Sequence, residues 1–535
     1  MPNISKEKGV IMAKKKKEQG ESSVNENEDS KQDKLIMELL DELPLIRTEN
    51  YVGVQIVLNG KREFVPIDED KVFGYLVHEL KDRYGIWAKT NAIKNCITYK
   101  KFEGYDKELT ELKLRIAYHD DSIIYDLCDG KCVVVNKYGW EVKENEYTFF
   151  KHYPDQKVQI TPIPCKDGWK RIEKYLNIPE EDKILVIAYI IACFNPQYTF
   201  PSISINGGYR TGKSTITNLI KDIIDPSTSS SEMLLNSFDD LKVRLNSCYY
   251  VAFDNLSKIS NSMSNFFCTV INGTTLTTRK KFENDTPFII TLKRGMCLNG
   301  IGNFIINPDL VDRMLFINTK PFSKDSRIGE KKIELNQAED MPYILGSIFE
   351  LLSKALGTVD SVKISEPFRL IDFHRFCYAI AEAMGGYGED FNNAIKRNKD
   401  RQNEIVYENF EIVRIIEDFL IENDYEWSSS VEMLYKSIKG FVELDDENKY
   451  NRKAIPKAPN AFSRLLTFHE SDLAERGFRF EKKKNGKGVK EITFYYVKKI
   501  IRTPIIGIRK PIILGIDNTN ITAELLNKLF DDEDN

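Results

Sequence analysis

Apolar positions are almost absent from the first 33 residues of the chain, which are rich in Lys, Glu, Ser and Asn. A segment of this composition cannot bury enough apolar surface to fold, so we predict a disordered tail over residues 1–33. The basic run Lys14–Lys17 leaves a second interpretation open, a weak nucleic-acid-binding or targeting arm.

Residues 34–165 combine two periodicities. Helical spacing of apolar residues predicts amphipathic helices near 34–42 and 71–84. Apolar runs of strand length then predict three strands, at residues 123–127, 132–135 and 139–142. We therefore expect an N-terminal α+β domain, and its sequence contains no recognisable catalytic constellation.

The pattern changes again in the rest of the chain. Residues 166–334 alternate strands with helices, which is typical of an α/β domain with a parallel sheet. Residues 335–425 are predicted to be mostly helical. Residues 426–498 predict two helices followed by a hairpin, and residues 499–535 a C-terminal tail with an acidic tip.

A phosphate-binding motif gives the α/β segment its candidate chemistry. The sequence from Gly207 to Ser214 matches GxxxxGK[ST], between a strand predicted at 200–205 and a helix whose apolar face ends at Asp225. Backbone N–H groups of such a loop, at a helix N-terminus, hold anionic phosphates. The expected nucleotide-binding residues are Gly207, Gly208, Tyr209, Arg210, Thr211, Gly212, Lys213, Ser214 and Thr215. Lys213 is expected to reach the β- and γ-phosphates, and Ser214 to ligate Mg²⁺.

A second carboxylate strand is predicted for the same site. The apolar run 248–253 indicates a buried parallel strand that ends in Asp254, which we expect to position Mg²⁺. The next residue is Asn255, where many such ATPases carry Glu. An amide can orient a water but cannot accept its proton. The general base is therefore left open, with Asp254 acting through a water as one alternative.

Two further polar residues flank predicted strands. Asn299 follows the strand at 296–298, where its amide could hold the attacking water beside the γ-phosphate. Arg313 precedes the strand at 314–317. Taken alone, Arg313 would be interpreted as a surface salt bridge. Together with the other motifs it is a candidate arginine finger that acts on a neighbouring subunit.

The order of these motifs resembles a known family. GGYRTGKST, YYVAFDNLS, TTRKKFENDT, CLNGIG and NPDLVDRMLF together are similar to the superfamily 3 and related ring-forming AAA+ helicases of phages, plasmids and chromosomal-cassette elements. The resemblance implies an AAA+ P-loop core over 166–334, a helical lid over 335–425 and a winged-helix domain over 426–498. It also implies a hexameric ring with ATP sites between subunits, threading single-stranded DNA.

Two basic hairpins are candidates for DNA contact. In the resembling family a hairpin between the Walker B helix and the Asn strand touches DNA, and here Arg279, Lys280, Lys281 and Lys293 flank its acidic tip. The C-terminal hairpin carries Lys482, Lys483, Lys484 and Lys487 around a glycine turn, which suits phosphate contacts by a winged helix. The alternatives are a solvated strand face for the first and a protein-docking surface for the second.

Composition and charge exclude several classes of protein and agree with the function that the motifs predict. The 535 residues carry 77 Lys and Arg against 81 Asp and Glu, so a globally basic nucleic-acid coat is excluded but a local basic groove is not. Nine Cys are far below a disulfide scaffold, and Cys128 and Cys132 lack a second ligand pair, so no zinc site is predicted. The apolar run 184–194 is too short to span a bilayer. We expect a soluble, reduced, cytoplasmic protein.

The combined prediction is an ATP- and Mg²⁺-dependent DNA helicase for replication of a phage or mobile element. Its expected partners are single-stranded or forked DNA, other copies of the chain in a ring, and replication proteins bound through the C-terminal tail. The alternative is an NTP-switched initiator or scaffold that assembles on DNA without unwinding it. A helicase–primase is disfavoured, because residues 34–165 contain no separate acidic primase constellation.

Overall fold

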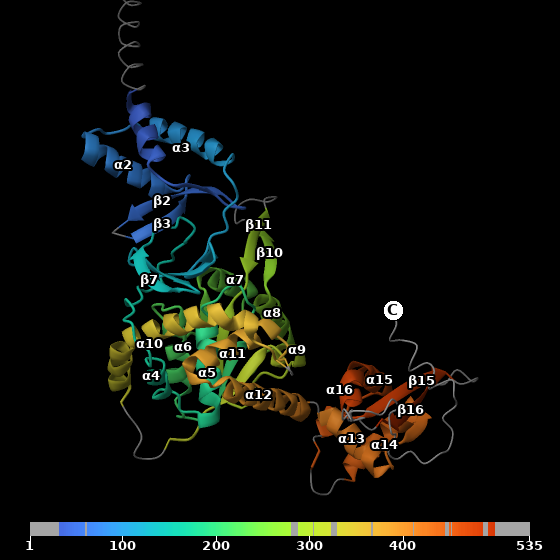
Figure 1. Ribbon diagram of the computed structural model, residues 1–535. Coiled ribbons are helices and arrows are strands. Elements are labelled where there is room, and N and C mark those ends of the chain that lie inside the picture. The colour runs from blue at the N-terminus through green and yellow to red at the C-terminus, as the bar shows by residue number, and fades with distance from the viewer. Residues whose placement is uncertain are drawn as a thin grey trace, which may run out of the picture. The chain divides into compact units, whose positions relative to one another are not determined.

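The computed structural model describes residues 31–58, 61–279, 287–302, 304–322, 329–364, 367–409, 411–444, 449–450, 452–484 and 490–497. The predictions for most of the N-terminal tail, for Lys280 and Lys281, for Lys487 and for the C-terminal tail lie outside these residues. The chain divides into two compact units, one up to Asn409 and one from Phe410 onward. Figure 1 labels the elements of both units.

The described part of the first unit starts with a helix over residues 31–41, followed by a three-stranded antiparallel sheet. Its strands are β1 (Leu45–Arg47), β2 (Val52–Leu58) and β3 (Lys61–Pro66), followed by helices α2 (Asp70–Tyr84) and α3 (Thr90–Gly104). One apolar core joins these elements. The two predicted helices are confirmed within two or three residues, whereas the three strands and α3 were not predicted.

A four-stranded antiparallel meander follows, in the order β4-β5-β6-β7. The strands are β4 (Ile116–His119), β5 (Ser122–Asp126), β6 (Lys131–Asn136) and β7 (Gly139–Glu144), and the last three confirm the predicted strands. Alternate residues of β5 enter two cores: Ile123 and Tyr125 belong to the large core of the first unit, and Ile124 to a small core on the opposite face. Both faces are therefore covered, which explains the continuous apolar runs in the sequence.

The predicted parallel α/β sheet is confirmed. It contains β8 (Ser202–Asn206), β9 (Tyr250–Leu256), β12 (Gly295–Gly300) and β13 (Met314–Asn318) in the order β13-β8-β12-β9. All three pairings are parallel, and the register pairs Asn206 with both Gly300 and Asn318. The carboxyl ends of β8, β12 and β13 thus share one edge. The connecting helices are α6 (Lys213–Ile224), α7 (Phe238–Ser247), α8 (Asn261–Asn272) and α9 (Pro308–Val311).

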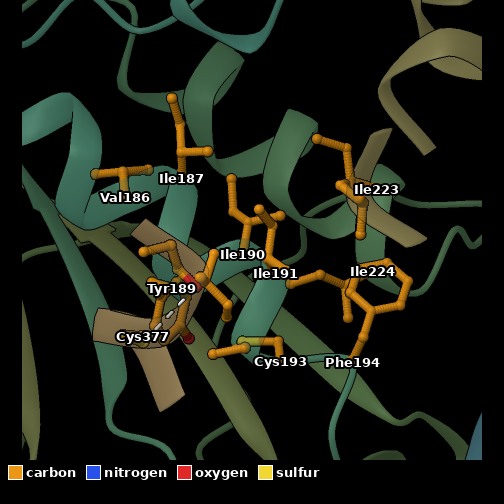
Figure 2. Close-up of a cluster of buried hydrophobic side chains, with 14 of the residues drawn as sticks. Val186, Ile187, Tyr189, Ile190, Ile191, Cys193, Phe194, Ile223, Ile224 and Cys377 are labelled. Carbon is orange, nitrogen blue, oxygen red and sulfur yellow. Dashed lines mark hydrogen bonds between the residues drawn. The ribbon is translucent and has the colours of Figure 1, made fainter. Parts of the chain in front are cut away.

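The apolar run that is too short for a membrane span forms a buried helix. After the short helix α4 (Lys170–Glu173), helix α5 (Glu180–Ala192) has apolar residues on every side, and those from Leu185 to Ile191 have no exposed surface. Figure 2 shows its side chains beside Ile223 and Ile224 of α6 and Cys377 of α11 (Ile371–Gly385). None of the described helices is long and apolar enough to cross a membrane.

Two further helices complete the first unit, α10 (Glu330–Thr358) and α12 (Gly388–Asn409), with the 3-10 turn η1 (Val359–Ser361) between α10 and α11. The predicted hairpin is present as β10 (Thr274–Arg279) and β11 (Pro287–Leu292). The Asn50 side chain pairs with the edge of this hairpin, donating to the carbonyl of Ile289 at 2.7 Å and accepting from its N–H at 2.9 Å.

The second unit is a small α+β body with its own core. It comprises α13 (Glu411–Glu422), β14 (Trp427–Ser430), α14 (Val431–Glu443), η2 (Arg452–Ala454), α15 (Pro459–Phe468), α16 (Glu470–Glu475), β15 (Phe478–Lys484) and β16 (Lys490–Tyr496). The strands form an antiparallel sheet in the order β14-β16-β15. Ser430 caps α14 through the N–H of Met433, as the serine run predicts. Helix α13 packs in this unit, although the predicted boundary at residue 426 assigned it to the preceding helical segment.

Candidate nucleotide-binding site

The glycine loop connects β8 directly to α6. Gly212 has a φ of +84° and is the N-cap of α6, so the helix begins at Lys213. Arg210 has a φ of +57°, which turns the exposed loop back on itself. A Cβ on Gly207 would lie 1.9 Å from Thr319 Oγ1, so only glycine fits there. The loop therefore aims the free N–H groups of a helix start at one point beyond the sheet.

Lys213 folds back across this loop. Its ammonium donates to the carbonyl of Gly207 at 3.1 Å and to that of Gly208 at 2.6 Å. Burial lowers the pKa of Lys213 below its usual range, and the charge of Asp254 opposes that change. The ammonium is thus held over the loop by neutral acceptors, where an anion would gain a charge-assisted contact.

Asp254 lies near the carboxyl end of β9 and is half-buried, while Asn255 is exposed with a φ of +60°. The N–H of Asp254 donates to the carbonyl of Glu232 at 2.9 Å, and the N–H of Glu232 donates to the carbonyl of Ala252 at 3.0 Å. This pairing fixes the backbone at Asp254, directly before the left-handed conformation of Asn255. The influence of Asp254 on the pKa of Lys213 places both groups in one electrostatic site.

Asn299, on β12, is 1% exposed and joins two elements of the site. Its Oδ1 accepts from the N–H of Asn255 at 3.4 Å, and its Nδ2 donates to Thr217 Oγ1 on α6 at 3.2 Å. The amide therefore links the turn after Asp254 to the helix that follows the loop. Its predicted role in holding a water stays a prediction.

The structure adds residues that the sequence did not indicate. Thr319, just after β13, donates to Thr211 Oγ1 at 2.6 Å or to the carbonyl of Asn206 at 3.1 Å. Asn177 donates to the carbonyls of Thr211 at 3.0 Å and Lys320 at 2.5 Å. These contacts tie the loop to the end of β13. Thr319 could have been predicted from the sequence, because it is a polar residue at the end of an apolar parallel strand. The same feature identified Asp254 and Asn299.

Arg313 lies at the other end of the sheet. Its carbonyl accepts from the N–H of Ser202 at 3.0 Å, at the start of β8, whereas the loop follows the end of β8. Five residues of strand separate the two ends, about 16 Å. The side chain is 8% exposed and pairs with the carboxylate and carbonyl of Asp309. Its Nε is buried without a hydrogen-bond partner among the described residues. Arg313 is therefore not brought together with the loop of its own chain.

The candidate DNA contacts have different environments. Lys293 is partly buried, which lowers its pKa, and its ammonium lies 3.4 Å from the carbonyl of Pro196. Lys482 contacts α15, donating to the carbonyl of Ser463 at 3.0 Å and to Thr467 Oγ1 at 2.6 Å. Lys483 is 80% exposed beside Glu481. For Arg279 and Lys484 only the strand position is described.

The residues at the carboxyl edge of the sheet fit a magnesium nucleotide. A helix start and the Lys213 ammonium suit phosphate oxygens, and the exposed Ser214 and half-buried Asp254 supply the oxygen ligands that Mg²⁺ prefers. The space at Gly207, which a Cβ would fill, permits close approach of the loop backbone to Thr319. This arrangement can bind and polarise a terminal phosphate.

Comparison with known proteins gives a family for the centre of the chain. Residues 172–394 match the family described as "Actinomycete integrative conjugative element replication protein". The match covers the buried helix α5, the parallel sheet, the loop and helices α10 and α11. It confirms the resemblance to mobile-element replication proteins that the motifs indicate. No curated protein matches the chain.

Two kinds of solved structure are similar to the chain at low identity. The apo A form of the C-terminal region of NrS-1 is 12% identical, covers 86% of this chain and 98% of its own, and gives a TM-score of 0.41. A JCV helicase bound to a small molecule is 14% identical, covers 41% of this chain and 59% of its own, and gives a TM-score of 0.24.

Proposed function

We propose that this chain, whose centre matches a family of mobile-element replication proteins, is an ATP-dependent DNA helicase that works as a ring on single-stranded DNA. The observation that carries the proposal is the glycine loop between β8 and α6, with Lys213 folded across it, the charge of Asp254 acting on Lys213, and Asn299 bonded to Thr217 of α6. An AAA+ P-loop core is the architecture that this convergence supports.

In this proposal each residue at the sheet edge has a separate task. The loop backbone and Lys213 bind the β- and γ-phosphates, while Ser214 and Asp254 hold Mg²⁺. The bound Mg²⁺ supplies charge neutralisation on the phosphate oxygens. Asn299 and Asn255 orient the attacking water. Asp254 acting through a second water is the candidate for taking its proton, because Asn255 cannot.

The position of Arg313 supports assembly of several copies. Because it lies about 16 Å from the loop of its own chain along the strands, it can reach a γ-phosphate only on a neighbouring copy. Its pairing with Asp309 would have to exchange for that phosphate. A ring in which each copy completes the next site, with six members in the resembling family, satisfies this geometry.

DNA contact is assigned to two regions. The β10–β11 hairpin and Lys293 lie in the catalytic unit, and the second unit combines helices with a basic hairpin in the manner of a winged helix. Lys483 is the better phosphate contact of its cluster, because Lys482 already bonds to α15. Replication partners are assigned to the C-terminal tail.

The test is unwinding of a forked duplex by purified full-length protein with ATP and Mg²⁺. We expect wild type to separate the strands and Lys213→Ala to lose both unwinding and ATP hydrolysis while retaining its fold. Lys354→Ala is the matched control, because this exposed lysine on α10 pairs with Glu350 of the same helix and lies outside the proposed site. Wild-type ATP turnover in Lys213→Ala would overturn the assignment of the loop.

The second candidate is an initiator or scaffold that binds DNA and switches on nucleotide binding. The burial of Arg313 against Asp309 favours it, because an arginine that stays engaged in its own chain leaves the neighbouring site incomplete. ATP-dependent assembly on DNA without strand separation, under conditions where ATP is hydrolysed slowly or not at all, would select this candidate.

A further inference from the structure

Three side chains with metal-binding atoms meet in the antiparallel meander, away from the loop. Asp126 ends β5, Cys128 lies in the turn to β6, and His152 belongs to the segment after β7. One atom of each, a carboxylate oxygen, Sγ and a ring nitrogen, lies within 4.8 Å of the other two. The proposed helicase function uses none of them.

Surrounding hydrogen bonds orient these three groups. Oδ1 of Asp126 accepts from the N–H of Cys128 and from Asn145 Nδ2, both at 3.0 Å. Its other oxygen, Oδ2, therefore faces His152 Nε2 and lies 3.6 Å from Cys128 Sγ. Hydrogen bonds to Oδ1 thus hold the carboxylate in place, and Oδ2 is directed at His152 and Cys128.

The histidine is oriented in the same way. Its Nδ1 lies 2.6 Å from the carbonyl of Arg62, and a carbonyl only accepts, so Nδ1 carries a proton. Nε2 is then the nitrogen directed at Asp126 and Cys128, and a bound cation would displace to solvent the proton that Nε2 shares with the Asp126 carboxylate and the proton of the Cys128 thiol. A ring N–H that donates to a backbone carbonyl while the other nitrogen faces the ligands is the usual support of a metal-bound histidine.

We propose that Asp126, Cys128 and His152 bind a divalent cation of the zinc class. Sulfur, imidazole and carboxylate donors together suit Zn²⁺ and not the hard cations Mg²⁺ or Ca²⁺. Cys128 has a φ of +59°, a backbone conformation that brings its sulfur back toward the end of β5. Three protein ligands leave the fourth position to water, and Cys128 and His152 both retain some solvent exposure.

A buried cation beside the sulfur limits the affinity of this site. Nη1 of Arg115 lies 3.0 Å from Cys128 Sγ. Its charge is shared with Asp225 at 3.2 Å, and its remaining N–H groups donate to carbonyls, including that of Lys157 at 2.8 Å. The guanidinium can therefore stabilise a metal-bound thiolate by donating a hydrogen bond. Its positive charge repels the cation, so the affinity for the metal is lower than it would be beside a neutral donor.

Binding of an ion would connect elements of the first unit that lie far apart in the sequence. His152 is tied through Arg62 to β3, and Asp126 is tied through Asn145 to the end of β7. A bound ion would join the three-stranded sheet, the meander and the segment that leads to the parallel sheet. This proposal departs from the prediction that the chain has no zinc site. That prediction considered Cys128 with Cys132, which is fully buried, whereas the ligands proposed here lie two and 24 residues apart in the sequence.

The experiment uses full-length protein stripped with a chelator and titrated with Co²⁺ and with Zn²⁺, in excess Mg²⁺ to fill oxygen-only sites. We expect one Co²⁺ per chain with a thiolate-to-cobalt absorption band that Zn²⁺ displaces. Cys128→Ser is expected to lose the band, and Asn145→Ala to lower the affinity 10- to 100-fold. Cys165→Ser is the matched control, because Cys165 is the other described thiol with partial exposure.

A second measurement does not depend on the folding of variants. In wild type, Zn²⁺ should slow alkylation of Cys128 but not of Cys165, as located by mass spectrometry. Absence of the cobalt band in wild type would overturn the proposal. So would a band that persists in Cys128→Ser, or equal alkylation of Cys128 with and without Zn²⁺.

Discussion

Asp225 is the buried anion on which three parts of the first unit depend, and Asp225→Asn is predicted to loosen them together. One oxygen, Oδ2, accepts from Lys221 Nζ at 2.9 Å and from the N–H groups of Tyr249 and Tyr250 at 2.9 and 3.1 Å. The other accepts from Arg115 Nε at 3.2 Å. The carboxylate thereby joins the end of α6, the start of β9 and the residue directly before β4.

The magnitude follows from burial. Arg115, Lys221 and Asp225 are each no more than 1% exposed, so removing the negative charge leaves two buried cations without the carboxylate that pairs with both of them. Breaking a buried pair in this way costs about 3–5 kcal/mol. An equilibrium constant changes tenfold for about 1.4 kcal/mol, so local opening should become about 10²- to 4 × 10³-fold more frequent.

Hydrogen exchange at the start of β9 is the assay, because it measures local opening without requiring two-state unfolding of a large chain. The amides of Tyr249 and Tyr250 should exchange faster in Asp225→Asn by that factor. Asp222→Asn is the matched control, since Asp222 is one turn earlier on α6 and burial raises the pKa of its carboxyl. Adding Lys221→Met to Asp225→Asn should recover part of the protection, because it removes one of the two cations.

The pH dependence gives an independent check. Burial alone would raise the pKa of Asp225, but Lys221 and Arg115 lower it to about 2. Since the folded pKa lies below the unfolded one, the stabilisation is complete above about pH 4 and is lost as the pH falls toward 2. Wild type and Asp225→Asn should therefore converge at the acid end. Equal exchange in the two proteins at neutral pH, or strict additivity with Lys221→Met, would refute the reasoning.

Four further outcomes test the nucleotide and DNA assignments. Arg313→Ala should bind nucleotide normally but hydrolyse it poorly, and mixing it with Lys213→Ala should restore some turnover; no rescue after confirmed subunit exchange would argue against action between copies. Asn299→Ala should reduce hydrolysis more than nucleotide affinity, as measured by turnover and by equilibrium binding. Gly207→Ala should weaken nucleotide binding because its Cβ meets Thr319 Oγ1, and Thr319→Ala should recover part of the affinity. Lys483→Ala should flatten the slope of log K for DNA binding against log salt by about 0.7–0.9, and an unchanged slope would favour a protein-docking role. Lys482→Ala should mainly lower the melting temperature of the second unit.

The sequence by itself determined the local units of this protein. The strand, glycine loop and amphipathic helix at 200–225 were predictable because each depends on backbone conformation and on spacing within a few residues. The same is true of the strand ends at Asp254 and Asn299, where an apolar run stops at a polar residue. Strands β1–β3 were missed although they are also local; β1 has three residues and β3 begins with three charged ones, but β2, VGVQIVL over Val52–Leu58, carries the same apolar signal as the predicted strands.

Only the tertiary structure determined which residues from different local units come into contact. Thr319 reaches the loop only because β13 lies next to β8, and Arg313 is separated from that loop by the length of the same strand. Asp225 acquires its charge partner Arg115 from the segment directly before β4, 110 residues earlier in the chain. The cluster of Asp126, Cys128 and His152 likewise forms when the chain after β7 returns to the meander. Such contacts depend on strand order and on packing between distant segments, which hydrophobic periodicity does not specify.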